Sequence, residues 1–402
     1  MAVESSRRVL VLSQFFPPEP YAGAKRMAAM AGALATRHHV TVATLEPGYP
    51  SAADYAHLPV ADLDRERRYE IRRRGRLEPH RASDAHRATA ELRMATRLAG
   101  RALGDRCDVV LTSSPSMFLG PAGLALARLR GARFVWDVRD ITWDYAAEAR
   151  TSAGVSRSSI SALRRLMWSI VPRADLVLAA TPGIAATLSA QRPDARVRTV
   201  PNAVVPEELL ALAPPERGRL DPPRVTYVGL VGDAQRLAVL LAVAERMPQV
   251  AFSVVGRGPE RAQLEARASE RGLRNVEFAA HVNPSGLLEH YRAADILFAQ
   301  VRSTPTLDQT AMPSKLMEYM ASGRPVIYAG NGHAAAEIER IGSGLAVSPE
   351  EPQAIETAIQ ALVGDPRRAV ALGAAGRAYA RSRREERVLS TALLAAIEEL
   401  DS

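Results

Sequence analysis

The chain has 402 residues, 47% of them hydrophobic, and a formal net charge of +8. This length suits two domains, each with its own core, and no apolar run approaches the roughly 18 residues of a membrane-spanning helix. Cys107 is the only cysteine, which excludes intrachain disulfides and a cysteine metal cage, and the first residues lack the apolar region of a signal peptide. We therefore expect a soluble protein in a reducing cytoplasm.

The positive charge is concentrated in one segment. Residues 65–106 contain 13 arginines and six acidic residues, an excess close to the +8 of the whole chain. The remaining sequence is nearly balanced, and no zinc-finger, homeodomain or RNA-binding signature accompanies the arginines. Nucleic acid is therefore not an expected partner.

Short apolar strands alternate with helices along the first half of the chain. Residues 8–13 (RVLVLS) predict a buried parallel strand, which a Pro- and Gly-rich turn, an Ala-rich helix to about residue 37 and a strand at 39–45 follow. This pattern is a βαβ unit. Further strands are predicted at 107–112, 133–138, 175–179 and 198–202.

Two stretches of this first half carry candidate ligand-binding residues. In the first turn, Gly23 would let a ligand approach the backbone, and Lys25 stands at the start of the following helix. In the second stretch, Arg139, Asp140 and Asp144 lie just beyond the strand at 133–138. Ligands of open α/β sheets bind at such strand ends.

The second half of the basic segment predicts a helix. Arg93, Arg97 and Arg101 follow one another at i, i+4 spacing, while Met94 and Leu98 share another face. This stripe is either a solvated face or a docking surface for an anionic acceptor or for membrane headgroups.

A proline-rich linker separates two predicted domains. The linker, residues 206–223, contains five prolines. Residues 1–205 precede this linker, and residues 224–381 contain a second series of alternating strands and helices. A last long helix over about 366–400 is expected to break near residue 382, so that residues 382–402 cross back to the first domain.

Residues 311–326 (AMPSKLMEYMASGRPV) predict a helix that begins at Lys315 with Ser314 as N-cap and ends at Gly323. The free amides and dipole of a helix start favour an anion, and Lys315 adds a full charge there. Glu318, one turn further, could accept hydrogen bonds from a ribose. Alternatively, this is a capped surface helix that only packs its apolar residues into a core.

The lysine content singles out two positions. Lys25 and Lys315 are the only lysines, against 50 arginines. An ammonium is a compact charge on a flexible stem, so these are candidate sites where arginine would not serve. Chance survival of the two lysines is the alternative.

Nine segments, in this order, resemble the GT-B glycosyltransferases, specifically the large retaining group known as glycosyltransferase family 4. They are SQFFPPEPYAGAKR, HVTVAT, FVWDVRD, ADLVLAATPG, VPN, VVGRGPER, NVEFAAHV, AADILFAQ and PSKLMEYMASGRPVI. The resemblance covers essentially the whole chain and is strongest to the branch that builds surface polysaccharides and related conjugates, including aminosugar transferases. It implies two doubly wound, Rossmann-like domains facing each other across a cleft, with the acceptor on the first and the nucleotide sugar on the second.

The resemblance also implies roles for individual residues. Glu318 matches the second Glu of an E-x7-E motif that binds the ribose, and Ser314 and Lys315 match the turn that faces the pyrophosphate. Arg139 and Asp140 match a position near the reacting sugar. The implied catalytic residues are Arg139, Asp140 and Lys315, and the implied donor-binding residues are Gly23, Lys25, Gly229, Arg236, Gly256, Val282, Thr310, Ser314, Lys315 and Glu318.

Three positions depart from the family pattern. Thr310 replaces the first Glu of the motif, with Asp308 near enough to substitute. Leu230 replaces the usual phosphate-binding Arg, so Arg236 or the lysine of the helix would carry that charge. The common Asn-Gly-Val-Asp run reads Asn-Ala-Val-Val at residues 202–205.

The expected activity is a retaining, metal-independent transfer of a sugar from a UDP- or GDP-sugar. The acceptor would be sugar-like, lipid-linked or a small natural product, and the nucleotide sugar is a co-substrate, so no cofactor is expected. Amides with Lys and Arg would stabilise the leaving diphosphate, and no D-x-D metal signature appears at a plausible strand end. The alternatives are a sugar-nucleotide 2-epimerase and a non-catalytic paralogue that binds nucleotide sugars.

The protein would be cytoplasmic or at the inner face of the membrane, where residues 65–106 would contact the membrane. The sequence does not predict its oligomeric state.

Overall fold

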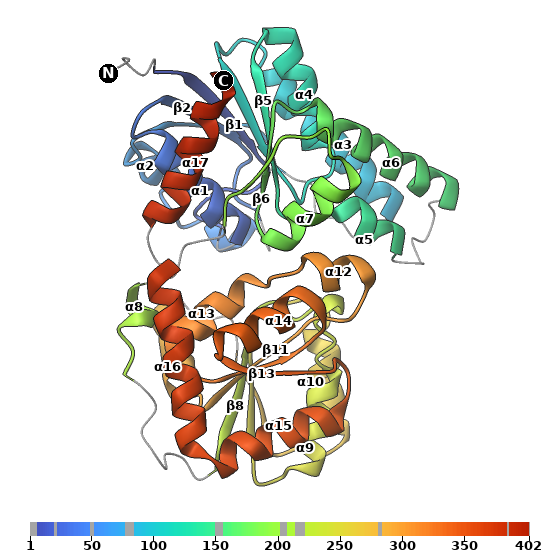
Figure 1. Ribbon diagram of the computed structural model, residues 1–402, viewed down its shortest axis with the longest axis vertical. Coiled ribbons are helices and arrows are strands. Elements are labelled where there is room, and N and C mark those ends of the chain that lie inside the picture. Colours follow the sequence, from blue (N-terminus) through green and yellow to red (C-terminus); the bar gives the residue numbers. More distant parts are fainter. Residues whose placement is uncertain are drawn as a thin grey trace. The chain divides into compact units, whose positions relative to one another are not determined.

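The computed structural model describes residues 6–19, 22–48, 52–76, 84–148, 156–201, 207–213, 222–279, 284–383 and 386–401. The chain divides into two compact units. Unit 1 contains residues 1–204 and 385–402, and unit 2 contains residues 205–384. Figure 1 shows both units.

Unit 1 is built around a parallel sheet of seven strands in the order β3-β2-β1-β4-β5-β6-β7. The strands are β1 (Arg8–Ser13), β2 (His39–Thr44), β3 (Glu70–Arg73), β4 (Val109–Ser113), β5 (Arg133–Val138), β6 (Leu176–Ala179) and β7 (Val197–Thr199). The helices are α1 (Ala22–Leu34), α2 (Val60–Arg65), α3 (Asp84–Arg101), α4 (Leu119–Arg130), α5 (Thr142–Glu148), α6 (Arg157–Ile170), α7 (Pro182–Gln191) and α17 (Glu386–Glu398). Short 3₁₀ turns cover Ala52–Tyr55, Val171–Arg173 and Glu399–Asp401.

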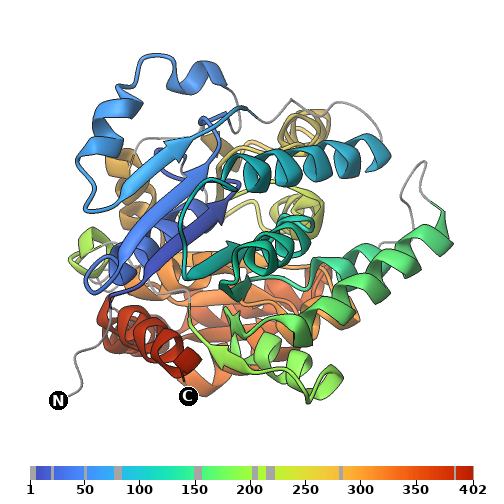
Figure 2. The same ribbon diagram turned by 90° about the horizontal axis from the view of Figure 1, so that it is seen from above.

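Helices cover both faces of this sheet, as Figure 2 shows. On β1, Leu10 and Leu12 pack in the core formed with α3, α4, α6 and α7, whereas Val9 and Val11 pack in the core formed with α1 and α17. Successive side chains of a strand point to opposite faces, so a strand covered on both faces is apolar throughout. This explains why the sequence RVLVLS predicts both ends of β1 correctly.

Strand β3 is not among the strands that the sequence predicts. Three of its four residues (EIRR) are charged, it pairs only with β2 at the edge of the sheet, and all its side chains are partly or fully exposed. An edge strand needs neither two strand neighbours nor two apolar faces. The basic segment therefore contains β3 as well as the predicted helix, α3.

Unit 2 is built around a parallel sheet of six strands in the order β10-β9-β8-β11-β12-β13. The strands are β8 (Arg224–Val228), β9 (Ala251–Val255), β10 (Val276–Ala279), β11 (Ile296–Gln300), β12 (Val326–Ala329) and β13 (Gly344–Val347). The helices are α8 (Glu207–Leu210), α9 (Ala238–Arg246), α10 (Arg261–Glu270), α11 (Pro284–Ala293), α12 (Pro305–Thr310), α13 (Ser314–Ser322), α14 (Gly332–Ile341), α15 (Pro352–Gly364) and α16 (Pro366–Arg383), with a 3₁₀ turn at Asp233–Gln235.

Both units are doubly wound α/β sheets, which confirms the predicted pair of Rossmann-like domains. The strand order reverses between β1 and β4 in unit 1 and between β8 and β11 in unit 2. Crevices for ligands lie at the carboxyl ends of the strands beside such reversals. In each unit, ligand-binding residues are therefore expected in the loops that follow these strands.

The last predicted helix is two helices. The helix α16 ends at Arg383 and α17 begins at Glu386. Leu389 and Leu393 of α17 share the core of unit 1 with Met27 and Met30 of α1, and Figure 1 shows the two helices side by side.

Candidate functional site

Lys315 lies in the first turn of α13, with its ammonium against Tyr227 near the end of β8. Nζ lies 4.1 Å from the centroid of the Tyr227 ring and donates a hydrogen bond to the Tyr227 hydroxyl, which donates to the carbonyl oxygen of Leu230. Burial raises the pKa of Tyr227, so this hydroxyl keeps its proton. One buried ring thus fixes both the ammonium and the loop after β8.

The same burial acts on Lys315. It lowers the pKa of the ammonium to about 7, against a smaller opposite effect of the Glu318 carboxylate. A bound diphosphate would raise this pKa again, because a nearby negative charge favours the charged form of an amine.

Two glycines bring the backbone close to this ammonium. Gly229 follows β8 with a φ of +145°, and a Cβ there would lie 2.8 Å from Lys315 Nζ. Gly256 follows β9 with a φ of +146°, and a Cβ there would lie 1.8 Å from the carbonyl oxygen of Gly229. Both positions exclude a side chain, so the predicted glycines allow two loops and an ammonium to meet.

Glu318 lies one turn beyond Lys315 and is partly exposed. Its Oε2 accepts a hydrogen bond of 2.9 Å from the Tyr291 hydroxyl of α11. Within the described ranges, Oε1 has no hydrogen-bond partner, so it is available to a ribose hydroxyl. The buried Tyr319 hydroxyl accepts from the amide and donates to the carbonyl of Val228, at 2.8 and 2.9 Å, which ties α13 to the end of β8.

The predicted N-cap of α13 is wrong. Ser314 is the first helical residue and is exposed, and the N-cap is Pro313, which has no side-chain acceptor. The first turn closes instead through a 2.9 Å bond from the amide of Leu316 to the carbonyl of Pro313. Because no serine hydroxyl caps the helix, its first amides are more available to an anion than the sequence predicts.

Arg236 is paired with an acidic residue of its own loop. Its guanidinium lies 3.3 Å from Asp233, which also accepts a 2.7 Å hydrogen bond from Arg302. Leu230, which replaces the arginine of the family pattern, exposes 46% of its surface. Lys315, rather than Arg236, is therefore the better-placed cation for a phosphate.

The position of the missing first Glu offers no free polar group. Thr310 is 5% exposed, and its hydroxyl donates a 2.6 Å bond to the carbonyl of Thr306 within α12. Asp308, the suggested substitute, is partly exposed and accepts a 2.6 Å bond from the Ser303 hydroxyl. Of these two residues, only Asp308 offers a carboxylate.

In unit 1, the ends of two adjacent strands are joined at Ser114. Its hydroxyl oxygen, which follows β4, accepts hydrogen bonds from the amides of Arg139 and Asp140 after β5, at 2.7 and 3.3 Å. Ser114 is 3% exposed, the Arg139 side chain is partly exposed and the Asp140 side chain is exposed. Asp144 is engaged differently: its carboxylate accepts from Arg164 and Trp168 of α6, at 2.6 and 2.9 Å, which indicates a structural role.

The predicted glycine and lysine of unit 1 both lie in the first turn of α1. Gly23 is buried and Lys25 is exposed. The next residue, Arg26, is 3% exposed and binds Asp137 of β5, with Nη2–Oδ1 at 2.6 Å and Nε–Oδ2 at 3.0 Å. Its Nη1 and Nη2 also donate to the carbonyls of Pro201 and Val200. Sequence reasoning missed this pair, although a charged residue inside an apolar strand is a signal of a buried partner.

Two predicted features lie outside the described residues, namely Val282 and the run at 202–205. Among the residues that the structure does describe, no group of three or more His, Cys, Asp and Glu could hold a metal ion.

None of the helices within the described ranges is long and apolar enough to cross a membrane.

Comparison with known proteins identifies similar sequences and folds. The family model described as "Glycosyl transferases group 1" matches residues 222–365, and the "Glycosyl transferase 4-like domain" matches residues 22–203. A GDP-mannose-dependent alpha-(1-6)-phosphatidylinositol monomannoside mannosyltransferase of Mycolicibacterium smegmatis is 28% identical over 280 residues, which are 67% of this chain and 70% of that protein.

Two solved structures show the same fold over nearly the whole chain. Sucrose-phosphate synthase from Thermosynechococcus elongatus matches with a TM-score of 0.73 at 18% identity, covering 98% of this chain and 99% of that one. Anabaena Alr3699/HepE in complex with UDP-glucose matches with a TM-score of 0.69 at 15% identity, covering 98% and 100%. At these identities the likeness concerns the fold, which is GT-B.

Proposed function

The chain belongs to the glycosyltransferase family that these two models describe, and from that premise we propose a retaining, metal-independent transfer of a sugar from a nucleoside-diphosphate sugar. One observation carries the proposal. The Lys315 ammonium is held beside Gly229 at the uncapped start of α13, with the Glu318 carboxylate one turn further. A cation with free amides suits a diphosphate, and a carboxylate suits ribose hydroxyls.

The chemistry follows from the charge that develops on the leaving group. As the bond to the sugar breaks, the diphosphate gains negative charge, which preorganised amides and the Lys315 ammonium stabilise. The acceptor attacks from the face that the diphosphate leaves, and a phosphate oxygen takes the acceptor proton. In this scheme Arg139 and Asp140 of unit 1 bind the reacting sugar, and Lys25 with Gly23 contributes to the phosphates.

The donor and acceptor classes follow from the relatives only as proposals. The mannosyltransferase relative is named for GDP-mannose and a phosphatidylinositol monomannoside, and the Anabaena neighbour was solved with UDP-glucose. We propose a GDP- or UDP-sugar as donor and a sugar-like acceptor, lipid-linked or a small natural product. Thermal unfolding with a panel of nucleoside diphosphates would identify the base.

An NMR time course with donor and acceptor in excess chelator tests the reaction itself. We expect a glycoside with the anomeric configuration of the donor, at a rate that chelator does not change, because lysine and amides replace the metal. Inversion, or a strict requirement for Mg²⁺ or Mn²⁺, would contradict the mechanism. Epimerised nucleotide sugar formed without acceptor would indicate a 2-epimerase instead.

The arginine stripe of α3 supports a proposal about where the acceptor is found. Arg93, Arg97 and Arg101 are all exposed, whereas Met94 and Leu98 are 6% and 1% exposed, so the predicted faces of the helix are confirmed. We propose that this stripe attracts an anionic acceptor carried at the inner face of the membrane.

Changing Arg93, Arg97 and Arg101 together to glutamine should raise the acceptor KM and flatten its dependence on salt, because the steering charge is removed. The affinity for the donor should stay unchanged. Steady-state kinetics across a salt series measures both. If neither the acceptor KM nor its salt dependence moves, the stripe is only a solvated face.

A further inference from the structure

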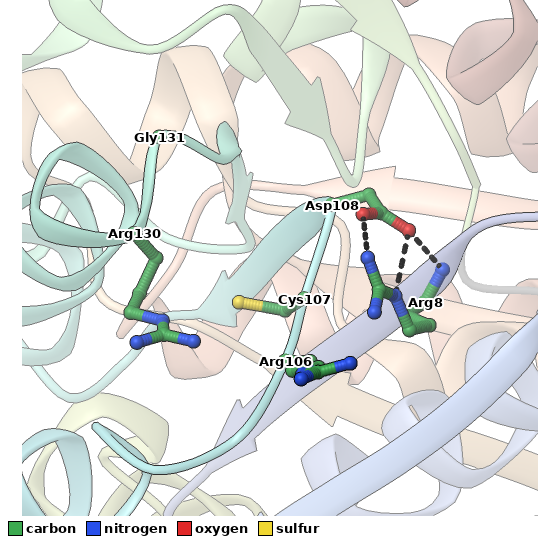
Figure 3. Close-up of a pocket in the computed structure, with 6 residues that line it drawn as sticks. All are labelled: Arg8, Arg106, Cys107, Asp108, Arg130 and Gly131. Carbon is green, nitrogen blue, oxygen red and sulfur yellow. Dashed lines mark hydrogen bonds and ion pairs between the residues drawn. The ribbon is translucent and has the colours of Figure 1, made fainter.

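A pocket of about 400 Å³ opens in unit 1, lined by Arg8, Arg106, Cys107, Asp108, Arg130 and Gly131 (Figure 3). Arg8 begins β1, residues 106–108 lead into β4, and residues 130–131 lead into β5. These three strands are neighbours and parallel, so their amino ends lie together at one end of the sheet. Ser114 and Arg139 follow the carboxyl ends of β4 and β5, at the opposite end. The pocket is therefore separate from the candidate residues of unit 1.

The charges of the lining residues do not cancel. Arg8 and Asp108 bind each other, with Nη2–Oδ1 at 2.7 Å and Nε–Oδ2 at 3.2 Å, and the Arg8 amide adds a 2.8 Å bond to Oδ2. Over the ranges that the structure describes, the guanidinium groups of Arg106 and Arg130 have no carboxylate or hydrogen-bond partner. Two positive charges of the pocket are thus uncompensated.

No other lining group cancels this net positive charge. Cys107 is 8% exposed, and burial raises the pKa of its thiol, with the charge of Arg130 as a smaller opposing effect, so the thiol is uncharged at neutral pH. The α4 helix ends at the pocket, where Gly131 is its C-cap. A helix end contributes only about half a negative charge, which two guanidinium groups outweigh.

We propose that this pocket binds a phosphate group, either free phosphate or the headgroup of a phospholipid, at a site distinct from the donor site. Guanidinium groups offer parallel N–H donors that match phosphate oxygens. The volume exceeds what one phosphate needs and lies in the range of small-ligand sites, so part of the molecule that carries the phosphate would fit as well.

Cys107 provides a local reporter, because it is the only thiol of the chain and lines the pocket. Figure 3 shows its sulfur between Arg130 and the Arg8–Asp108 pair. The test is the rate of its reaction with neutral N-ethylmaleimide in chloride and in inorganic phosphate at equal ionic strength. A parallel series replaces inorganic phosphate with vesicles of phosphatidylcholine, with and without phosphatidylglycerol. This reporter belongs to unit 1, whereas Lys315 belongs to unit 2.

We expect bound phosphate to slow the reaction, because it covers the sulfur and disfavours the reactive thiolate. The Arg106→Gln, Arg130→Gln double variant should need about tenfold more phosphate for half the effect, or more, because charge-assisted hydrogen bonds are lost. Asp108→Asn should need less, because it frees Arg8. Arg267→Gln, an exposed arginine of unit 2, is the matched control and should behave as wild type. Ratios of rates with and without phosphate are compared within each variant, since Arg130 itself affects the thiol pKa.

The outcomes separate the two sources of phosphate. An effect of inorganic phosphate that the double variant weakens supports a site for a soluble phosphate compound. An effect only of vesicles that contain phosphatidylglycerol, again weakened in the double variant, supports a headgroup site. If neither probe changes the rate, or if the double variant and Arg267→Gln respond like wild type, the proposal is wrong.

Discussion

Replacing Lys315 with arginine will lower kcat/KM at least about tenfold, or roughly 1.4 kcal/mol of transition-state stabilisation. The lysine Nζ rests on the Tyr227 ring, and the adjoining space is so narrow that even a Cβ at Gly229 would lie 2.8 Å from it. A guanidinium is longer and planar, so it cannot occupy the volume of the ammonium. Steady-state kinetics, with circular dichroism to verify folding, measures the effect.

Lys25→Arg is the matched control, since it makes the same change at the other lysine of the chain. The Lys25 side chain is exposed, so its longer replacement meets no fixed ring and the loss should be smaller. Wild-type kinetics for Lys315→Arg would instead show that this lysine survived by chance. The phosphate charge would then be assigned to Arg236.

The pH dependence of nucleoside diphosphate binding provides a second measurement for Lys315→Arg. The pKa of Lys315 is about 7, below its ordinary value of 10.5, so above about pH 7 the free wild-type protein holds mostly neutral amine. A bound diphosphate raises this pKa, so binding in that range takes up a proton and weakens as the pH rises. Arginine stays protonated, so the variant should lack the proton uptake. Calorimetry in buffers of different ionisation enthalpy measures it.

Replacing Arg26 with alanine will destabilise unit 1 by about 3–5 kcal/mol, because it leaves the Asp137 carboxylate buried without a counter-ion. The two side chains are 2% and 0% exposed, and Asp137 otherwise keeps a 2.8 Å bond from the Ser113 hydroxyl. The change also removes donors to the carbonyls of Val200 and Pro201. Denaturant unfolding of the full chain measures the loss.

The Arg8–Asp108 pair is a matched control for burial. It has the same residue types and a similar distance, 2.7 Å against 2.6 Å, but its side chains are 48% and 40% exposed. Solvent screens such a pair, so Arg8→Ala should change the stability little. Equal losses for the two arginines would show that burial of the Arg26–Asp137 pair does not determine its contribution.

The elements that the sequence predicts well are those buried on both sides. The strands β1 and β5 match their predictions to the residue, because a strand between two helical layers is apolar along its length. The edge strand β3 has no such signature, since one neighbour and partial exposure suffice for EIRR. The start of α13 is displaced by one residue, because Pro313 rather than Ser314 accepts the first bond of the helix.

The candidate site shows the same division between local and distant information. One short segment contains the helix start, Lys315 and Glu318. The sequence alone therefore predicts that they lie close together. Their partners Tyr227 and Tyr291 lie 88 and 27 residues away, and only the fold brings them together. No local pattern distinguishes these tyrosines from other buried aromatic residues.

Calorimetric titration of nucleosides and nucleoside diphosphates, in uridine and guanosine series, tests most directly whether α13 binds the donor. Glu318→Ala should weaken both ligands by about 1.5–3 kcal/mol, because both contain the ribose that its carboxylate would bind. Lys315→Ala should weaken only the diphosphate, since the nucleoside has no phosphate to lose. Unchanged affinities in both variants, or an equal loss for nucleoside and diphosphate in Lys315→Ala, would contradict a pyrophosphate site at this helix.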